Sequence, residues 1–299
     1  MGAKLRVVRR RIRSVQSTKK ITRAMELIAS SRIVKAQQRV EASRPYAQQL
    51  TAAMEDLARH AGGALQHPLL EEREAPAKAG VLVVTSDRGL AGAYNANVLK
   101  IGEGLLREAR DRGLEPALYV IGKKGVGYFR FRKVPMRASW QGFSEVPPYD
   151  KAEEIGRHLI AEFAAAEIDE LRCAYTDFRS AFTLRATSKR FLPIAPQEVT
   201  GASGPTVVHP EYLFEPEPGL ILDSLLPQYL ITKVYAAMLE SAASENASRR
   251  RAMKAATDNA EDLIKVLTRQ ANRARQDEIT TEIMEIVGGA EALAATAED

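Results

Sequence analysis

The chain has 299 residues, a formal net charge of +5, only 6% aromatic residues and a single cysteine, Cys173. This length allows one or two domains, and a lone cysteine excludes a disulfide framework and fits a reducing compartment. No run of about 18 apolar residues occurs, so the sequence predicts no membrane-spanning helix.

The first predicted element is a long helix that starts at Ala3 and resumes, after an interruption at Pro45, to reach Ala61. No Gly or Pro occurs over residues 3–44. The first apolar side chains recur in steps of three and four, as a coiled-coil seam requires: Leu5, Val8, Ile12 and Val15. The Gly62-Gly63 pair that follows predicts the end of the helix.

The charge of this helix is one-sided, because residues 1–44 hold thirteen Lys and Arg against two Glu. Such a stripe is typical of a solvated helix face, of a surface that meets an acidic protein, or of a nucleic-acid-binding surface. Aromatic residues are absent before Tyr46, so the stripe lacks a platform on which bases could stack. The sequence leaves these three interpretations open.

The middle of the chain alternates predicted strands and helices behind a linker over residues 62–80. The predicted elements are strands at 80–85, 117–121, 170–175 and 182–191 and helices from the turn at 86–95 to about 112 and from about 151 to 166. This order predicts a βαβαβ unit with a parallel sheet. Six prolines over residues 193–219 predict a loop before the last helix.

Glycines follow two of the predicted strands, where phosphates often bind. The segment DRGLAGAYN at 87–95 matches neither phosphate-binding glycine motif, so we expect a tight strand-to-helix turn. We expect GKKG at 122–125 to be a loop turn. The four histidines lack metal-ligand spacing, and Cys173 lies in a predicted buried strand, where cysteine acts as a small hydrophobe. The sequence therefore predicts no catalytic, cofactor-binding or metal-binding residue in this chain.

The last predicted element is a helix over residues 228–287, which contain no Gly or Pro. Roughly sixty residues give a rod of about 90 Å, so the helix needs a partner along its length. A stripe of apolar and small residues recurs at helical spacing: Ile231, Val234, Met238, Ala242, Met253, Ala256, Ala260, Leu263, Leu267, Ala271, Ala274, Ile279, Ile283 and Ile286. We expect Arg249, Arg250 and Arg251, which fan around the axis, to be solvated.

Three segments, in the same order along the chain, resemble the γ subunit of the bacterial F-type ATP synthase. They are GAKLRVVRRRIRSVQSTKKITRAMELIASSR, SDRGLAGAYNAN and MKAATDNAEDLIKVLTRQANRARQDEITTEIMEIVGGAEAL. The resemblance implies an α/β fold with a long antiparallel two-helix coiled coil and an inserted Rossmann-like βαβαβ domain. The parts would be an N-terminal shaft helix (1–61), the α/β domain (75–200) and a C-terminal shaft helix (209–299).

The function implied by the resemblance is that of a rotor, the central stalk of the F1 sector. Such a subunit couples proton flow through a membrane c ring to ATP synthesis at the β catalytic sites, and it has no catalytic site or cofactor of its own. The implied partners are the α and β subunits (the α3β3 hexamer), the ε subunit and the c-subunit ring, with no nucleic acid. The implied location is peripheral, on the cytoplasmic face of the bacterial cell membrane.

The resemblance also assigns roles to particular residues. Contacts with the α/β hexamer would come from Met25, Arg275, Gln276, Thr280 and Glu282. An apolar bearing tip would contain Ile283, Ile286 and Val287. A foot near ε and the c ring would contain Tyr212, Phe214 and Glu215.

Two other functions compete with the rotor hypothesis. A nucleic-acid-binding coiled coil would use the basic first helix and would bind with a steep salt dependence. A nucleotide-dependent enzyme would use the turn at 87–95 as a phosphate cradle.

Overall fold

The computed structural model describes residues 2–60, 67–180, 183–194 and 218–297. They fall into two compact units. The first comprises Met1–Ile28 with Arg250–Asp299, and the second comprises Ala29–Arg249. Two long helices, α1 (Gly2–His60) and α6 (Pro218–Ala297), contribute to both units.

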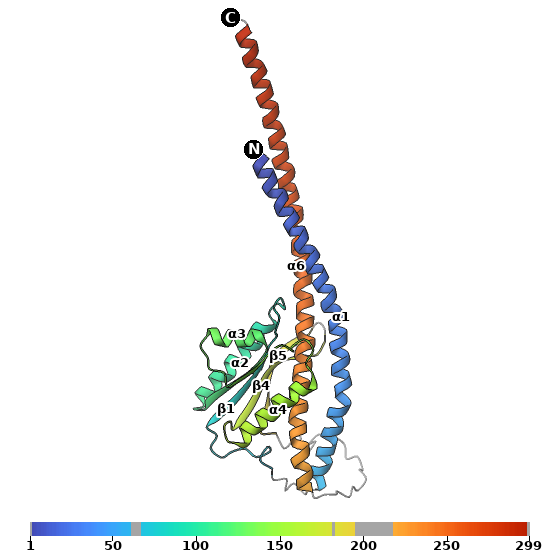
Figure 1. The fold of residues 1–299 in the computed structure, drawn as a ribbon, viewed down its shortest axis with the longest axis vertical. Helices are drawn as coiled ribbons and strands as arrows, with labels where there is room; N and C mark the ends of the chain where they lie inside the picture. The colour runs from blue at the N-terminus through green and yellow to red at the C-terminus, as the bar shows by residue number, and fades with distance from the viewer. Residues whose placement is uncertain (1, 61–66, 181–182, 195–217, 298–299) are drawn as a thin grey trace. The chain divides into compact units, whose positions relative to one another are not determined.

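The first unit is an antiparallel pair formed by the beginning of α1 and the end of α6 (Figure 1). The hydroxyls of Thr22 and Thr257 lie 2.8 Å apart, and the Lys19 ammonium binds the Glu261 carboxylate at 3.0 Å. Residue numbers rise along one helix where they fall along the other, so the helices are antiparallel. The buried side chains between them are mostly small or polar: Thr22, Glu26, Met253, Thr257, Ala260, Leu267 and Ala271.

The end of α6 extends past the beginning of α1 within this unit (Figure 1). Since both helices rise by the same distance per residue, the register places Gly2 opposite about Glu278. The helix nevertheless continues to Ala297. About 30 Å of α6 therefore has no partner from α1.

The second unit is built on one five-stranded sheet in the order β3-β2-β1-β4-β5. Its strands are β1 (Lys78–Val84), β2 (Glu115–Ile121), β3 (Ala138–Trp140), β4 (Glu170–Phe178) and β5 (Leu184–Leu192). The first four strands are mutually parallel, and β5 pairs antiparallel with β4. Because β1 is buried on both faces, its sequence is an almost continuous apolar run.

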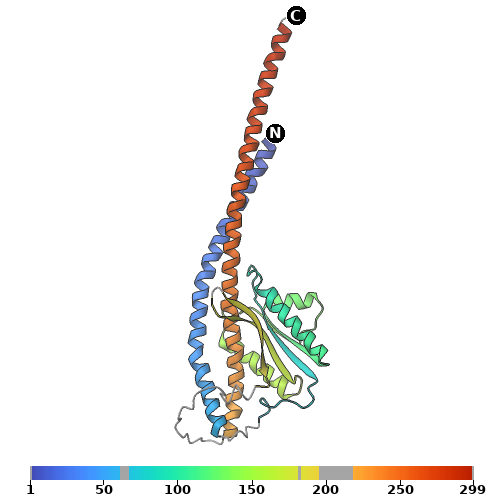
Figure 2. The same ribbon diagram turned by 180° about the vertical axis from the view of Figure 1, so that it is seen from behind.

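Helices cover both faces of this sheet (Figures 1 and 2). The helices α2 (Tyr94–Asp111) and α3 (Lys123–Phe131) pack on one face, around a core that includes Val83, Val98 and Phe129. The other face packs against α4 (Tyr149–Ala164) and α6 around a larger core. The sheet domain and the beginning of α6, as far as Met238, therefore share one apolar interior.

The expected fold class is confirmed: long N- and C-terminal helices flank a mixed α/β domain. The helix α1 does not break at Pro45 as expected, because Leu50, Met54 and Leu57 beyond it are held in a buried core. The carbonyl that proline leaves without a partner lies on a stretch whose side chains are exposed, where water can satisfy it. The division into parts at 1–61, 75–200 and 209–299 stays a prediction.

The segment GKKG was wrongly expected to be a loop turn, since Lys123 begins α3. Gly122 caps that helix with a φ of +97°, and a Cβ there would lie 2.3 Å from the carbonyl oxygen of Thr85. Only glycine fits this close approach between two strand ends. The short strand β3 was not predicted, and α6 begins at Pro218 rather than near Gln228.

Candidate functional site

The turn after β1 is held in place by hydrogen bonds to the carboxylate of Asp87. This group accepts hydrogen bonds from the backbone N–H of Lys123 at 3.0 Å and of Ser144 at 2.9 Å, and the Asp87 N–H donates to the Ser144 hydroxyl at 2.8 Å. Burial would raise the pKa of Asp87, but backbone hydrogen bonds from Ser144, Gly142 and Lys123 outweigh it and lower the pKa. Asp87 therefore stays ionised and connects the turn after β1 to the start of α3 and to the loop that carries Ser144.

The rest of the turn confirms the expected tight connection from strand to helix. The Asn95 side-chain oxygen accepts the Ser86 N–H at 3.0 Å, and the Ser86 hydroxyl donates to the Arg88 carbonyl at 2.7 Å. Leu90 and Gly92 both have positive φ, at 61° and 56°. The turn therefore has its hydrogen bonds satisfied internally and points the Leu90 side chain outward, where it is exposed.

Helix α6 covers the carboxyl ends of β1 and β4, where open parallel sheets bind ligands. The Ser241 hydroxyl lies 3.5 Å from the Thr176 N–H, and Ser244 donates to the Thr176 carbonyl at 3.3 Å. The cavity left at the strand ends, lined by Thr85, Tyr94 and Ser241 among others, is about 10 Å³. Small-molecule sites are usually about 300–1,000 Å³, so this crevice has no room for a nucleotide.

The expectation that Arg249, Arg250 and Arg251 are all solvated is wrong for Arg249. Its side chain is only 6% exposed and binds the Glu245 carboxylate at 2.5 Å and the Gly89 carbonyl at 3.3 Å. Burial raises the pKa of Glu245, while the Arg249 guanidinium counteracts that rise. The sequence did contain a signal, because Glu245 and Arg249 are four residues apart, the spacing at which opposite charges meet on one face of a helix.

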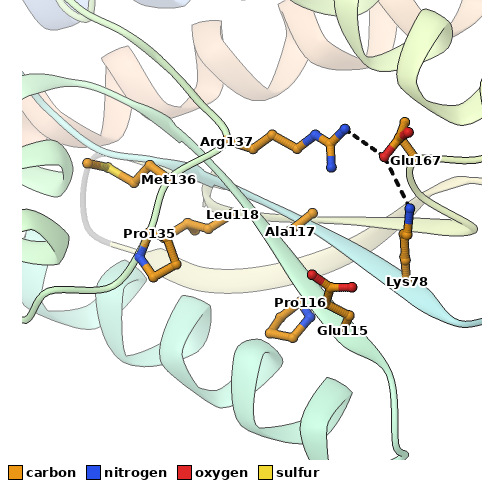
Figure 3. A pocket seen from close by; sticks show the side chains of 9 residues that line it. All are labelled: Lys78, Glu115, Pro116, Ala117, Leu118, Pro135, Met136, Arg137 and Glu167. Carbon is orange, nitrogen blue, oxygen red and sulfur yellow. Dashed lines mark hydrogen bonds and ion pairs between the residues drawn. The ribbon is translucent and has the colours of Figure 1, made fainter.

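A second cavity, of about 210 Å³, lies at the opposite, amino ends of β1 and β2 (Figure 3). Two cationic side chains of its wall, Lys78 and Arg137, both bind Glu167, at 3.1 and 2.8 Å (Figure 3). Both cations are thus already neutralised by a carboxylate. The cavity offers no uncompensated positive charge to a phosphate.

The residues assigned to the hexamer interface lie in the first unit. Met25 is half-buried on α1, whereas the four predicted contact residues on α6 are exposed: Arg275, Gln276, Thr280 and Glu282. None of the described side chains of α6 beyond Ala271 is buried, as far as Gly288. In the tip, Ile283 is 55% exposed, Ile286 72% and Val287 50%.

The foot residues Tyr212, Phe214 and Glu215 lie outside the described residues. Cys173 is fully buried, and burial raises the pKa of its thiol, as expected for a cysteine that packs as a hydrophobe. Among the described residues, no cluster of His, Cys, Asp or Glu could hold a metal ion. No helix in this part of the chain combines the length and hydropathy needed to cross a bilayer.

Comparison with known proteins identifies the family. A family model described as ATP synthase matches residues 4–293. The ATP synthase gamma chain of Acidothermus cellulolyticus is 54% identical over 302 residues, which cover 99% of each chain. The ATP synthase gamma chain of Thermobifida fusca is 52% identical and covers 99% of this chain and 98% of its own.

Two solved structures share the fold at low sequence identity. A chain of the Euglena gracilis mitochondrial ATP synthase (OSCP/F1/c-ring, rotational state 3) aligns with a TM-score of 0.71 at 18% identity, covering 100% of this chain and 97% of its own. A chain of the Tetrahymena thermophila mitochondrial ATP synthase (central stalk/c-ring) aligns with a TM-score of 0.58 at 23% identity, covering 79% and 99%. The chain therefore belongs to the ATP synthase gamma chain family.

Proposed function

We propose that this chain is the central-stalk rotor of the F1 sector of a proton-translocating ATP synthase. It is a non-catalytic subunit that couples ion flow through a membrane c ring to ATP synthesis from ADP and phosphate, and to the reverse hydrolysis. The catalytic sites would lie on the β subunits. The similarity to gamma chains along almost the whole length supports this role.

The observation that carries the proposal is the exposed apolar surface near the C-terminal end of α6. A helix that only faced water would be polar, yet this one exposes Ile279, Ile283, Met284, Ile286 and Val287 close together. Contiguous exposed apolar surface of this kind marks a site of contact with other chains. A ring of α and β subunits that surrounds the helix would cover it from several sides.

The interface residues follow from this placement. Arg275, Gln276, Thr280 and Glu282 are exposed polar side chains just before the apolar tip, so they are available to hydrogen-bond with the surrounding subunits. Ile283, Ile286 and Val287 would form a low-friction apolar bearing. Met25 on α1 would face an acidic segment of β, which suits the basic charge of that helix.

The remaining partners and the location are extensions of the same proposal. We place Tyr212, Phe214 and Glu215 in a foot that meets the ε subunit and the c ring. The chain would then lie peripherally on the cytoplasmic face of the bacterial membrane. Its described helices do not span a bilayer themselves, so attachment would run through the c ring.

Reconstitution with the α and β subunits tests the proposal. The full chain alone should hydrolyse no ATP, and adding it to α and β should yield a stoichiometric complex with higher ATPase activity. A variant with Ile283, Ile286 and Val287 all changed to Asp tests the tip, with Glu285→Gln as a control that changes an exposed side chain of the same stretch and keeps the apolar surface. Equal assembly and activity of α and β with and without the chain would refute the rotor role.

A further inference from the structure

One carboxylate, that of Glu145, is approached by three arginines from three different segments of the second unit. It lies in the loop between β3 and α4, and its side chain is 17% exposed. Arg32 of α1 binds it at 2.6 Å, Arg88 of the turn after β1 lies at 3.5 Å, and Arg249 of α6 lies at 3.7 Å. Both long helices are thus attached to the same side chain of the α/β domain.

The loop that carries Glu145 is itself held in place. The preceding residue, Ser144, exchanges two hydrogen bonds with Asp87, and its hydroxyl lies 3.2 Å from the Glu245 carboxylate. Pro147 and Pro148 follow, and they restrict the backbone before α4 begins at Tyr149. A displacement of this loop would therefore be passed to the arginines rather than absorbed by the loop.

The charges make the cluster depend on Glu145. Without its carboxylate, Arg32, Arg88 and Arg249 would be three like charges close together, with Glu245 partnering only Arg249. One oxygen of Glu145, Oε1, is buried and has no hydrogen bond, so it meets Arg249 through charge alone. An uncharged residue of the same shape would preserve the packing but lose this attraction.

We propose that Glu145 is a positioning residue that clamps α1, α6 and the α/β domain together, so that the three rotate as one rigid body. Torque that reaches the domain would then pass to both helices together. This inference rests on the proposed rotor function. Its consequence is that loss of the Glu145 charge should let hydrolysis continue while less of the rotation is transmitted.

The test compares Glu145→Gln and Glu145→Asp in the full complex, in inverted membrane vesicles. ATP hydrolysis and ATP-driven proton pumping are measured on the same preparations, and their ratio is the readout. Glu145→Gln should lower the pumping-to-hydrolysis ratio severalfold, and Glu145→Asp should restore much of it because the charge returns. A purely structural role would reduce assembly and both rates together and would leave the ratio unchanged.

Two further variants separate this site from general effects of charge. Arg32→Gln removes one arm of the clamp and should lower the ratio, whereas Lys35→Gln removes an exposed charge from the next turn of α1 and should not. In the free full-length chain, amides over residues 29–40 should exchange roughly five-fold faster in Glu145→Gln, a change equivalent to about 1 kcal/mol.

An unchanged pumping-to-hydrolysis ratio in Glu145→Gln would refute the clamp. If this variant does not assemble, unchanged amide exchange in the free chain would refute it instead. If the wild-type chain itself fails to support pumping, the rotor proposal fails instead. The two outcomes are therefore distinguishable.

Discussion

Replacing Arg249 with Met should destabilise the second unit strongly, although the substitution keeps most of the side-chain volume. The guanidinium is nearly fully buried and binds Glu245, whose own side chain is 1% exposed. It also donates to the Gly89 carbonyl at 3.3 Å. Removing one partner of a buried ion pair leaves an uncompensated charge, which costs about 3–5 kcal/mol.

The cost should depend on pH, because the variant can neutralise Glu245 by protonating it. Burial already raises the pKa of Glu245, and loss of Arg249 removes the main opposing interaction, so the folded-state pKa rises further. A carboxyl whose folded pKa exceeds its unfolded pKa is neutral in both states at low pH, and folding loses stability as pH rises toward the folded pKa. The deficit of Arg249→Met relative to wild type should therefore be smaller at pH 5 than at pH 8.

Urea unfolding of the full chain, followed by fluorescence, measures this difference. Trp140, the only tryptophan, lies on β3 and reports on the α/β domain. Arg250→Met is the matched control, since Arg250 is only partly buried, and it should change stability by no more than about 0.5 kcal/mol. Adding Glu245→Gln to Arg249→Met should recover part of the loss. A deficit below about 1 kcal/mol at pH 8, or one independent of pH, would refute this account of the pair.

Three further predictions concern single residues. Burial and the nearby Asp177 carboxyl raise the pKa of Glu240 from 4.5 to about 7. The wild-type melting temperature should therefore decrease as the pH rises from 4.5 to about 7. Glu240→Gln should make this decrease smaller, as thermal melts across pH would show. Gly122→Ala should lose about 3 kcal/mol or more in urea unfolding, because the new Cβ would meet the Thr85 carbonyl at 2.3 Å and the φ is positive. Met25→Lys should lower proton pumping per ATP hydrolysed with little change in melting temperature, since it adds charge at the proposed sliding contact. Equal coupling would remove Met25 from the interface.

The sequence was most informative where one physical requirement dominated a long stretch. A helix without Gly or Pro and with a regular apolar stripe is visible without any structure, and α6 conforms to that pattern over residues 228–287. The continuous apolar run of β1 likewise predicts a strand buried on both faces, which the structure confirms. In both cases the tertiary environment reinforces the local preference.

Prediction failed where tertiary contacts override local preference. The helix α3 starts within the segment GKKG, whose two glycines, Gly122 and Gly125, favour a turn. The helix forms because Gly122 fits against Thr85 and the Gly125 N–H donates to the Thr85 hydroxyl. The strand β3 has three residues, too few for a periodic pattern. The partners of Arg249 outside α6, Gly89 and Glu145, lie on two separate segments, and no spacing along the chain reveals them.

The environment of the apolar stripe of α6 changes along the helix, and this gives the stripe two distinct roles. Opposite α1 the buried positions combine small side chains such as Ala260 and Ala271, which let two helices approach closely, with the larger Met253 and Leu267. Beyond them the stripe continues with large residues, Ile279, Ile283 and Ile286, although nothing in this chain covers them in the described structure. Small residues there would lower the exposed apolar area without weakening the coiled coil. Keeping large ones is favourable only if another surface packs against them, so the free end of α6 is better explained as a contact surface than as a solvated helix end.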